Sequence, residues 1–575
     1  MPEQRNLILA IVLSVTIILA FQYFYELPRI QEAQRQEQLR EPRPALPDDP
    51  ARPDDVIAPA PPGAVDPAAP DVATAEVVAT TERVSIVNDR VRGSLALHGA
   101  RLDALSLSNY QVTTDPRSAD VTLLSPPGTG HTYFAEVGWV AEDGAARVPD
   151  RDSVWEANRR EISPDHPVTL TWDNGEGLRF VREVVIDDNY MFTITQRVEN
   201  RSDQTVALHP YGLISRWGTP PTLGFFILHE GPIGVLANKL HELDYSDLQK
   251  DGEIQFESTG GWLGITDKYW LAALIPDQET PISGVFRHTI ANGEDRYQVD
   301  YLWPSMTVAP GSNITVTNRL FAGAKEVELL DHYETTFGIP LFDRAVDFGW
   351  FYFLTNPLFY ILHYFYLLTG NYGVAILILT LLVKIVFFPL ANKSYRAMSQ
   401  MKKLQPEMVR LREQYGDDKA RMNQELMALY KKEKVNPVSG CLPIIVQIPV
   451  FFALYKVLFV SIEMRHAPFF GWIQDLSAPD PTSLFNLFGI LPFDPPGFLM
   501  IGIWPLLMGA TMLLQTKLNP QPADPMQARI MMFLPLMFIF LFATFPAGLV
   551  IYWTWNNALS IAQQWVIMRR MGVSA

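Results

Sequence analysis

The chain has 575 residues, enough for several domains, and 48% of them are hydrophobic. Its formal net charge of −16 argues against a protein that binds nucleic acid in general or reads a specific base sequence. The single cysteine, Cys441, excludes a disulfide within the chain and a zinc site built from cysteine ligands.

The first predicted element is an N-terminal transmembrane anchor, residues 1–25. The run Leu7–Tyr25 is apolar and about 19 residues long, which suits a helix across a hydrocarbon core of ~30 Å. A cleaved signal peptide is the alternative. Cleavage requires small residues, however, whereas this run ends in four aromatic residues between Phe21 and Tyr25, as at a membrane interface. We therefore expect an uncleaved anchor.

Residues 26–80 are predicted to be a linker because of their composition. They are rich in proline, alanine and aspartate, as in PRPALPDDPARPDDVIAPAPPG, and cannot bury a hydrophobic core. Proline favours an extended chain, so we expect a tether between the anchor and the next domain. A proline-rich docking site is the alternative interpretation.

The next region, residues 81–335, has the pattern of an all-β domain. Apolar and polar residues alternate over Arg83–Ile86 and over Val168–Trp172, and the second run precedes an Asp-Asn-Gly turn signal. A further strand follows Asn292-Gly293, another turn signal. Many short strands with turns between them and little helix predict a β-sandwich.

Catalytic motifs are missing from the sequence. The histidines of the β region have no metal-ligand spacing, and the chain contains no G-x-S-x-G, Walker A or H-E-x-x-H motif. We therefore expect a binding or spacer module here rather than an enzyme, with no metal ion and no cofactor.

Apolar runs dominate the rest of the chain. Residues 345–368 are rich in aromatic side chains, which favours a helix lying along the membrane interface. Residues 369–570 are predicted to form a core of five spans. The expected spans are Tyr372–Leu390, Leu442–Ile462, Phe498–Gln515, Ile530–Phe545 and Ala547–Met568. With the anchor, the α-helical membrane bundle then has six spans in total.

The distribution of lysine and arginine predicts the topology. Residues 392–435 are strongly basic and the C-terminal end carries Arg569 and Arg570, whereas the segment 463–497 contains only Arg465. By the positive-inside rule, the basic segments and the C-terminus are cytoplasmic and the β domain lies outside. The charges around the anchor favour a cytoplasmic N-terminus as well.

The basic segment 392–435 is predicted to be a cytoplasmic helical hairpin. Its apolar residues recur at steps of three and four on both sides of a Gly-Asp-Asp turn. Three methionines belong to this apolar stripe, namely Met401, Met408 and Met422. They either pack the seam of the hairpin or form a soft surface that accepts varied apolar segments. The basic face is solvated, sits on anionic lipid or contacts a ribosome.

One cation, Lys384, lies within a predicted span, two or three residues past the midpoint toward the cytoplasm. A lysine at the centre of a span costs about 2.5–3.5 kcal/mol on insertion scales. Thr380 is four residues earlier and therefore on the same helix face. A lysine near the end of a span can also extend toward the interface, so snorkelling is the alternative interpretation.

Polar side chains in other spans accompany this cation. The last span has a stripe at helical spacing, and the second span adds two polar residues: Trp553, Asn557, Ser560 and Gln564 with Tyr552 beside them, then Gln447 and Lys456. These groups either make interhelical hydrogen bonds or line a wet groove. A groove also explains a cation without a carboxylate. Such a site suits a polar or acidic segment of a substrate, and argues against a proton-coupled transporter.

Three stretches resemble the YidC family of membrane protein insertases. They are GNYGVAILILTLLVKIVFFPL, MKKLQPEMVRLREQYGDDKARMNQELMALYKKEKVNPVSGCLPIIVQIPVFFALYKVL and DPMQARIMMFLPLMFIFLFATFPAGLVIYWTWNNALSIAQQ. The resemblance covers about Asp347 to Arg570. The layout is also similar to the Gram-negative form, with an anchor, a periplasmic β-supersandwich similar to sugar mutarotases, and five spans.

The resemblance implies a bacterial inner-membrane insertase and chaperone with both termini in the cytoplasm. It further implies a groove open to cytoplasm and lipid, and nascent membrane proteins and the Sec translocon as partners. The family's groove arginine corresponds to Lys384, which keeps the charge but loses bidentate binding of a carboxylate. The family's substrate-contacting threonine falls on Thr380, and its aromatic pair on Tyr552 and Trp553, where tryptophan replaces a tyrosine.

Two other classes of function are compatible with the residues alone. A small-solute transporter or channel is the first alternative, although the five spans show no internal repeat. A scaffold or receptor whose β domain binds a periplasmic ligand is the second.

Overall fold

The structure is a computed structural model. It describes residue 78 and residues 81–572, except 143, 145, 224–227, 350, 416–417, 434, 436–441, 490, 492, 494, 497–499 and 520–524. The predicted anchor, the predicted linker other than Val78, and Cys441 lie outside the described residues.

The described chain forms two compact units. The β unit comprises residues 81–361 and 452–477, and the helical unit comprises residues 362–451 and 478–572. The chain passes from one unit to the other within two continuous helices, α6 (Tyr352–Thr369) and α11 (Leu442–Val460).

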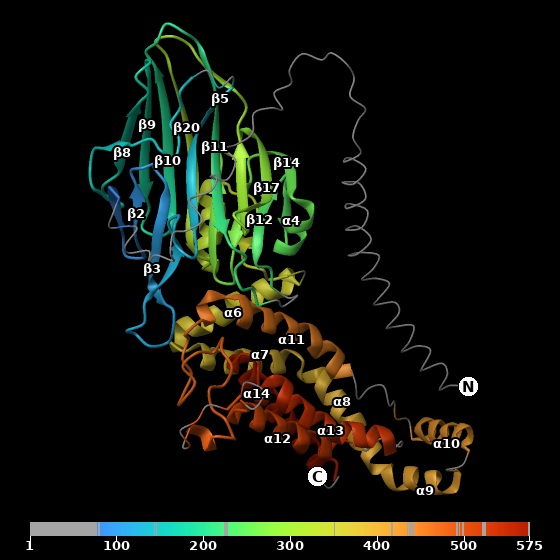
Figure 1. Cartoon of the computed structure of the whole chain (residues 1–575). Coiled ribbons are helices and arrows are strands. Elements are labelled where there is room, and N and C mark those ends of the chain that lie inside the picture. Colours follow the sequence, from blue (N-terminus) through green and yellow to red (C-terminus); the bar gives the residue numbers. More distant parts are fainter. Residues whose placement is uncertain are drawn as a thin grey trace, which may run out of the picture. The chain divides into compact units, whose positions relative to one another are not determined.

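The described strands of the β unit form two sheets (Figure 1). The eleven-stranded sheet contains β1 (Arg83–Val87), β2 (Val91–Ala96), β3 (Leu102–Gln111), β4 (Asp120–Leu124), β5 (Tyr133–Ala141), β7 (Glu161–Ile162), β11 (Val206–Trp217), β14 (Glu253–Thr259), β17 (Pro281–Ala291), β18 (Glu294–Leu302) and β19 (Met306–Val308). The nine-stranded sheet contains β6 (Glu156–Ala157), β8 (Val168–Asp173), β9 (Leu178–Ile186), β10 (Met191–Asn200), β12 (Gly231–Leu236), β13 (Lys239–Glu242), β15 (Trp262–Thr266), β16 (Trp270–Ile275) and β20 (Asn313–Ala324).

The sequence patterns explain these strands. Val84 and Ile86 of β1 are fully buried between more exposed neighbours, which confirms the predicted alternation. The turn that joins β17 to β18 consists of Asn292 and Gly293, both with positive φ, 56° and 80°. Such a pair matches the right-handed twist of the strands that it connects. The expected β-sandwich is therefore confirmed.

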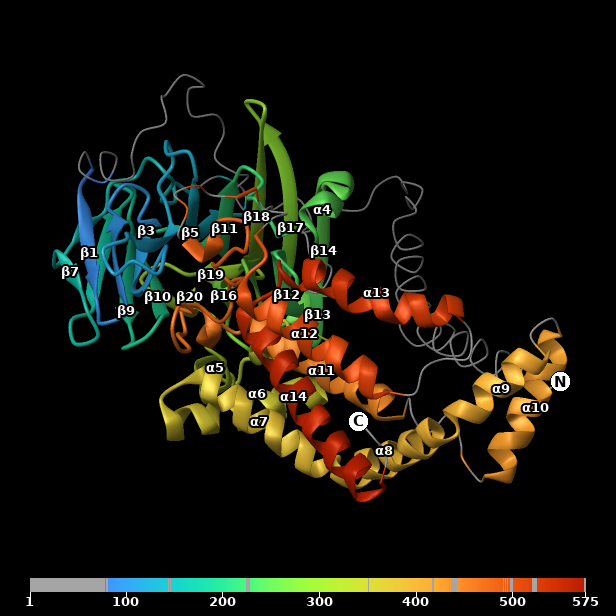
Figure 2. The same ribbon diagram turned by 90° about the horizontal axis from the view of Figure 1, so that it is seen from below.

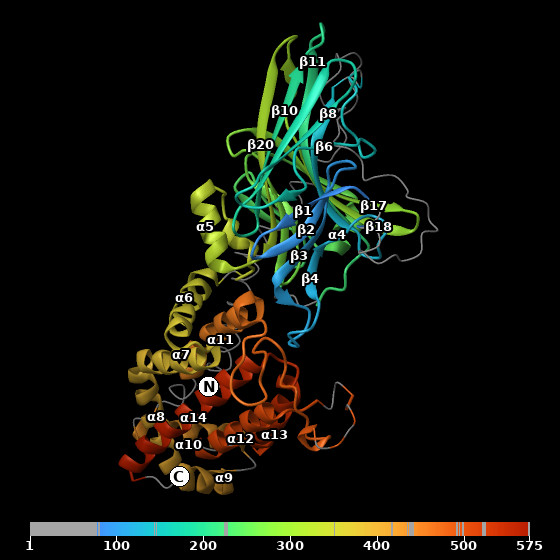
Figure 3. The same ribbon diagram turned by 90° about the vertical axis from the view of Figure 1, so that its left-hand side faces the viewer.

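Short helices flank the two sheets of the β unit. They are α4 (Tyr245–Asp251), α5 (Val327–Phe337) and the 3-10 helices η3 (Phe342–Ala345) and η5 (Ile462–Met464). Helix α5 lies against the nine-stranded sheet (Figure 3), where the Tyr333 ring packs edge-on against Phe321 of β20 at 6.0 Å. The Tyr333 hydroxyl also donates a hydrogen bond to Asp187 at 2.5 Å.

Residues 452–477, which follow the middle of α11, are attached to the β domain by polar contacts. Lys456 forms an ion pair with Asp347 at 2.9 Å. Arg465 donates a hydrogen bond to the Gln111 carbonyl at 2.6 Å. The sequence pattern groups Lys456 with the polar residues of the predicted spans. In the structure its ion-pair partner is Asp347, which lies 109 positions earlier in the chain and belongs to the β unit.

Glu463 caps helix α5 from this attached segment. Its Oε1 accepts a hydrogen bond from the Val327 amide at 3.0 Å, one of the N–H groups that a helix N-terminus leaves without an internal partner. Burial raises the pKa of the Glu463 carboxyl to about 7, and the nearby carboxylates of Glu326 and Glu328 add to the shift.

The raised pKa of Glu463 predicts a pH-dependent stability of the β unit. An acid whose pKa is higher in the folded state stabilises the fold below its unfolded value of 4.5 and loses this contribution as the pH rises through about 7. The free energy of unfolding should therefore fall between pH 5 and 7, by up to about 1.4 kcal/mol per pH unit. Glu463→Gln should remove this part of the slope. Thermal unfolding of both proteins from pH 5 to 8 measures it, and parallel curves would contradict the prediction.

The helical unit contains the remaining described helices. In addition to its parts of α6 and α11 it has α7 (Tyr372–Val386), α8 (Phe388–Lys403), α9 (Gln405–Tyr415), α10 (Lys419–Lys432), η6 (Leu487–Gly489), α12 (Ile503–Leu518), α13 (Pro525–Phe542) and α14 (Ala547–Arg570). Helix α14 is central, because it packs along α12 and also contacts α7 and α8 (Figure 2).

Among the described residues, no single helix is both long and apolar enough to cross a membrane. Helices α7 and α8 meet this condition only as a pair, and they are bent by 70° relative to each other. The predicted span Tyr372–Leu390 is therefore not one straight helix. Pro389, at the start of α8, explains the break, because its ring has no N–H and clashes with the carbonyl four residues earlier.

The other predicted boundaries differ by smaller amounts. The last predicted span agrees with α14 at its start, whereas α12 begins at Ile503, five residues later than expected. The predicted interfacial helix 345–368 corresponds to α6, which begins at Tyr352. The predicted hairpin 392–435 consists of the end of α8 followed by α9 and α10, and only these last two pair as a hairpin.

Candidate functional site

Lys384 lies in the last turn of α7, directly before the 70° bend, and its side chain is partly buried. Its Nζ donates a hydrogen bond to Ser560 Oγ on α14 at 2.7 Å. The Ser560 hydroxyl in turn donates to the Asn556 carbonyl at 2.8 Å. The cation is thus at the C-terminal end of a helix, where the helix dipole favours positive charge, and not near the middle of a straight span.

The partner of Lys384 is neutral. Within the described residues Lys384 takes part in no ion pair, and its hydrogen bond goes to a hydroxyl group. Ser560 is 3% exposed and lies close to the Tyr395 hydroxyl of α8. Helices α7, α8 and α14 therefore meet around one ammonium group whose charge no described carboxylate neutralises.

Thr380 lies one helical turn before Lys384 and is 1% exposed. Its hydroxyl donates to the Ile376 carbonyl at 2.6 Å, within its own helix. The structure therefore places Thr380 on the predicted helix face, but its donor is used by the backbone of α7.

The aromatic pair of α14 contacts two other helices. Tyr552 is 1% exposed, and its hydroxyl accepts a hydrogen bond from Gln447 Nε2 of α11 at 2.5 Å. The Trp553 ring packs edge-on against Phe451 of α11, with ring centroids 4.6 Å apart, and in a tilted arrangement against Phe542 of α13 at 5.3 Å. These contacts hold α11, α13 and α14 together at the level of the pair.

The amide side chains of α14 reach α12. Asn557 Nδ2 donates to Thr511 Oγ1 at 3.3 Å, and Gln564 Nε2 donates to Asn519 Oδ1 at 3.2 Å. The predicted interhelical hydrogen bonds are therefore present. Three buried amide atoms nevertheless have no hydrogen-bond partner among the described residues: Asn556 Oδ1, Gln563 Nε2 and Gln564 Oε1. A dry interface would penalise such atoms.

Polarity changes along α14. The side chains of its first turns, from Ala547 to Tyr552, are almost fully buried and apolar except for the Tyr552 hydroxyl. The polar groups, from Thr554 to Gln564, all lie nearer its C-terminus. Helix α14 therefore has a buried apolar N-terminal half and a polar C-terminal half.

The three hairpin methionines are packed inside the helical unit. Met408 is 8% exposed and lies with Leu426 and Leu429 in the seam between α9 and α10, where Met422 also packs. Met401 belongs to a different cluster, formed with residues of α8 and with Ile567 of α14. This arrangement favours packing of the hairpin and of α8 over a soft exposed surface.

Three residues of the site did not appear among the predicted site residues. Thr511 and Asn519 are the partners of the α14 amides, and Tyr395 lies next to Ser560. Thr511, Gln515 and Asn519 recur at steps of four, so a polar stripe on α12 could have indicated the first two. Ser560 itself was recognisable, since it lies on the stripe at helical spacing.

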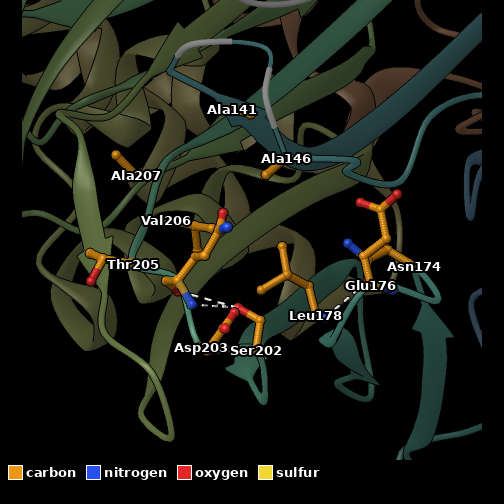
Figure 4. A pocket seen from close by; sticks show the side chains of 11 residues that line it. Ala141, Ala146, Asn174, Glu176, Leu178, Ser202, Asp203, Thr205, Val206 and Ala207 are labelled. Atoms are coloured by element: carbon orange, nitrogen blue, oxygen red, sulfur yellow. Dashed lines mark hydrogen bonds between the residues drawn. The ribbon is translucent and has the colours of Figure 1, made fainter.

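The β unit has a polar hollow of about 350 Å³ (Figure 4). Asn174 and Glu176 from the turn after β8 line it, together with Ser202 and Asp203 from the loop before β11. Asn174 Oδ1 accepts hydrogen bonds from the backbone of its own turn. No group of three or more possible metal ligands is present among the described residues.

Comparison with known proteins agrees with this two-part architecture. A family model described as YidC periplasmic domain matches residues 83–361, and one described as 60Kd inner membrane protein matches residues 364–573. The membrane protein insertase YidC of Methylobacterium radiotolerans is 49% identical over 590 residues, covering 99% of this chain and 96% of the relative. That of Rickettsia akari is 49% identical over 563 residues, covering 98% of each chain.

A solved structure is also similar. The active YidC insertase crystal structure with the first transmembrane domain resolved has 16% sequence identity, covers 84% of this chain and 92% of that chain, and gives a TM-score of 0.36.

The matches define the class first: this is an inner-membrane protein with a periplasmic β domain followed by a helical domain. More particularly, the chain belongs to the YidC family of membrane protein insertases. It is an insertase and not an enzyme. The alternative of a small-solute transporter or channel is wrong, because the family is one of insertases.

The hydrogen bond between Gln447 and Tyr552 predicts an energetic coupling between α11 and α14. Interhelical hydrogen bonds in membrane proteins contribute about 0.6 kcal/mol on average and at most about 1.7 kcal/mol. A double-mutant cycle with Gln447→Leu and Tyr552→Phe should give a coupling in this range. Unfolding of the four proteins in mixed micelles measures it, and strictly additive effects would show that the bond does not contribute.

Proposed function

We propose that nascent membrane proteins enter the membrane through a polar groove of the helical unit, with Lys384 as its cation. The observation that carries this proposal is the bond between Lys384 and Ser560. A hydroxyl group orients the ammonium group but does not neutralise it, so its charge stays available to an acidic group of a substrate. The unpaired amide atoms of α14 support a hydrated site at the same helix.

The polarity of α14 supports a groove with one closed end. In the predicted topology the C-terminus is cytoplasmic, so the polar half of α14, with Asn557 and Gln564, faces the cytoplasmic side. The apolar half, ending at Tyr552, then seals the periplasmic side. Hydrophilic segments enter from the cytoplasm, meet Lys384, and the apolar segment passes Thr380, Tyr552 and Trp553 into lipid.

The driving forces are sufficient without a nucleotide. At an effective dielectric of 20, a carboxylate about 4 Å from the Lys384 ammonium is attracted by about 4 kcal/mol. Partition of about 20 apolar residues, each worth ~0.3–0.6 kcal/mol, adds ~6–12 kcal/mol. The membrane potential moves an acidic tail outward with ~2.3 kcal/mol per charge per 100 mV.

The proposal includes the finer topology and the partners. The chain has six spans in total, of which five form the core, with both termini in the cytoplasm, and the β domain forms a periplasmic supersandwich. The hairpin of α9 and α10 ends in the exposed basic pair Lys431 and Lys432 and extends into the cytoplasm, where it contacts anionic lipid or a ribosome. The insertase acts alone or with the Sec translocon as its partner.

Reversal of the charge at Lys384 should impair insertion. Lys384→Glu replaces attraction by repulsion, so insertion of a short precursor with an acidic tail should fall at least about tenfold. Lys384→Arg should retain activity because the charge is kept. Lys393→Glu is the matched control, since Lys393 is exposed on α8 and receives the same charge change. Protease protection in proteoliposomes measures insertion. Equal activity of Lys384→Glu and wild type would exclude the groove cation.

Removal of the β domain distinguishes the insertase mechanism from a periplasmic receptor. A variant that lacks residues 81–335 should retain most of its insertion activity in the same proteoliposomes, because the proposed groove belongs to the helical unit. Lys384→Glu in this shortened background should abolish what remains. Complete loss on deletion, with the protein correctly integrated, would favour the receptor or scaffold.

A further inference from the structure

An uncharged apolar loop lies between α11 and α12. The stretch Pro481–Phe493 contains no charged residue. Its large apolar side chains are exposed in the described chain, to between 39% and 50%: Leu484, Phe485, Leu487, Phe488, Leu491 and Phe493. We call the described residues 484–489, 491 and 493 the apolar loop. Six exposed leucine and phenylalanine side chains in one short segment exceed the scattered apolar residues that a soluble surface normally carries.

The base of this loop is tied to the start of α12. Asp480 is 3% exposed, and its Oδ2 accepts a hydrogen bond from the Trp504 amide at 2.9 Å. Thr482 Oγ1 accepts from the Ile503 amide at 3.1 Å. Two of the N–H groups that begin α12 are thus capped from the loop side, and the Leu484 amide donates to the Ile501 carbonyl at 2.9 Å. The apolar loop therefore cannot move far from the N-terminus of α12.

The backbone of the loop directs large side chains outward. Leu487 and Phe488 have positive φ angles, 52° and 59°, a conformation that favours glycine. The Phe488 amide donates to the carbonyl of the fully buried Ser483 at 2.7 Å, which holds this turn. Two strained residues in succession, both large and apolar and both exposed, indicate a surface that serves contact with something outside the chain.

The length of α12 indicates where the apolar loop lies relative to the membrane. Its 16 residues span about 24 Å, which is less than the ~30 Å of the hydrocarbon core. Lys517, in its last turn, belongs at the cytoplasmic interface in the proposed topology. The N-terminus of α12 then lies below the periplasmic boundary of the hydrocarbon, and the attached loop lies at this boundary.

We propose that the apolar loop is embedded in the periplasmic leaflet, where lipid acyl chains and the headgroup boundary cover its leucine and phenylalanine side chains. The inference rests on the proposed membrane topology of α12. The missing charges fit this environment, since a charged side chain there would be penalised. The capping by Asp480 and Thr482 satisfies backbone groups that lipid could not. The loop thus completes the short span and anchors the periplasmic end of α12.

Spin labels in lipid vesicles test this proposal. Because Cys441 is the one cysteine of the chain, Cys441→Ser gives a background in which Phe485→Cys and Phe488→Cys can each be labelled. Leu514→Cys on α12, which is 49% exposed, is the lipid control, and Gln474→Cys, exposed in the segment before the loop, is the water control. The protein is reconstituted in phosphatidylethanolamine and phosphatidylglycerol, and accessibility to oxygen and to a nickel chelate is measured.

The oxygen-to-nickel accessibility ratio at Phe485 and Phe488 should exceed that at Gln474 at least fivefold and approach that at Leu514. Ratios equal to that of Gln474, with a lipid-like Leu514, would overturn the inference and leave the proposed topology intact, because the bilayer then thins around α12. Labels shielded from both reagents would also overturn it, in favour of a protein partner or a second copy. A water-like Leu514 would overturn the topology and the inference together.

Discussion

The 70° bend between α7 and α8 is the constraint on which the site depends. Because α7 ends two residues after Lys384, the ammonium group lies at the C-terminal end of the helix, where it contacts Ser560 of α14. The helix dipole and a hydroxyl partner together lower the cost of a partly buried cation without removing its charge. In a straight helix across the membrane, the same lysine would extend toward the interface instead. The break at Pro389 therefore lowers the free-energy cost of burying Lys384 and leaves its charge available.

The contacts of helix α14 determine how the other helices of the helical unit pack. Its apolar turns before Trp553 pack tightly, and its amides beyond that residue bond to α12. Hydrogen bonds across helices are weak individually, so they position the helices without fixing them rigidly. The atoms that stay unpaired, such as Gln564 Oε1, lie at the polar end. In the proposed groove, this weak and incompletely satisfied polar lining lets a hydrophilic segment enter and then leave.

Local sequence patterns predicted the helices and strands better than the bend between two helices or the contacts between distant segments. The alternation around Val84 and the Asn292-Gly293 turn were sufficient for the strands, because each depends on neighbouring residues. The polar stripe of α14 likewise followed from helical spacing. The bend at Phe387 was missed because apolar composition continues through it, although Pro389 marked the position. The pairs Lys456–Asp347 and Glu463–Val327 join residues more than 100 positions apart, which no local pattern reveals.

In the proposed groove, lysine rather than arginine at position 384 affects the kind of substrate that the site accepts. The ammonium group of Lys384 has three N–H donors. One of them is directed at Ser560, so the other two are free to point in other directions. It attracts a carboxylate as a point charge, from any direction, whereas a guanidinium group prefers the planar bidentate geometry. Substrates of an insertase differ in sequence and present their acidic groups at different positions. A cation with little directional preference, held by a hydroxyl group at the end of a helix, suits such varied segments, because binding then requires charge but not a particular geometry.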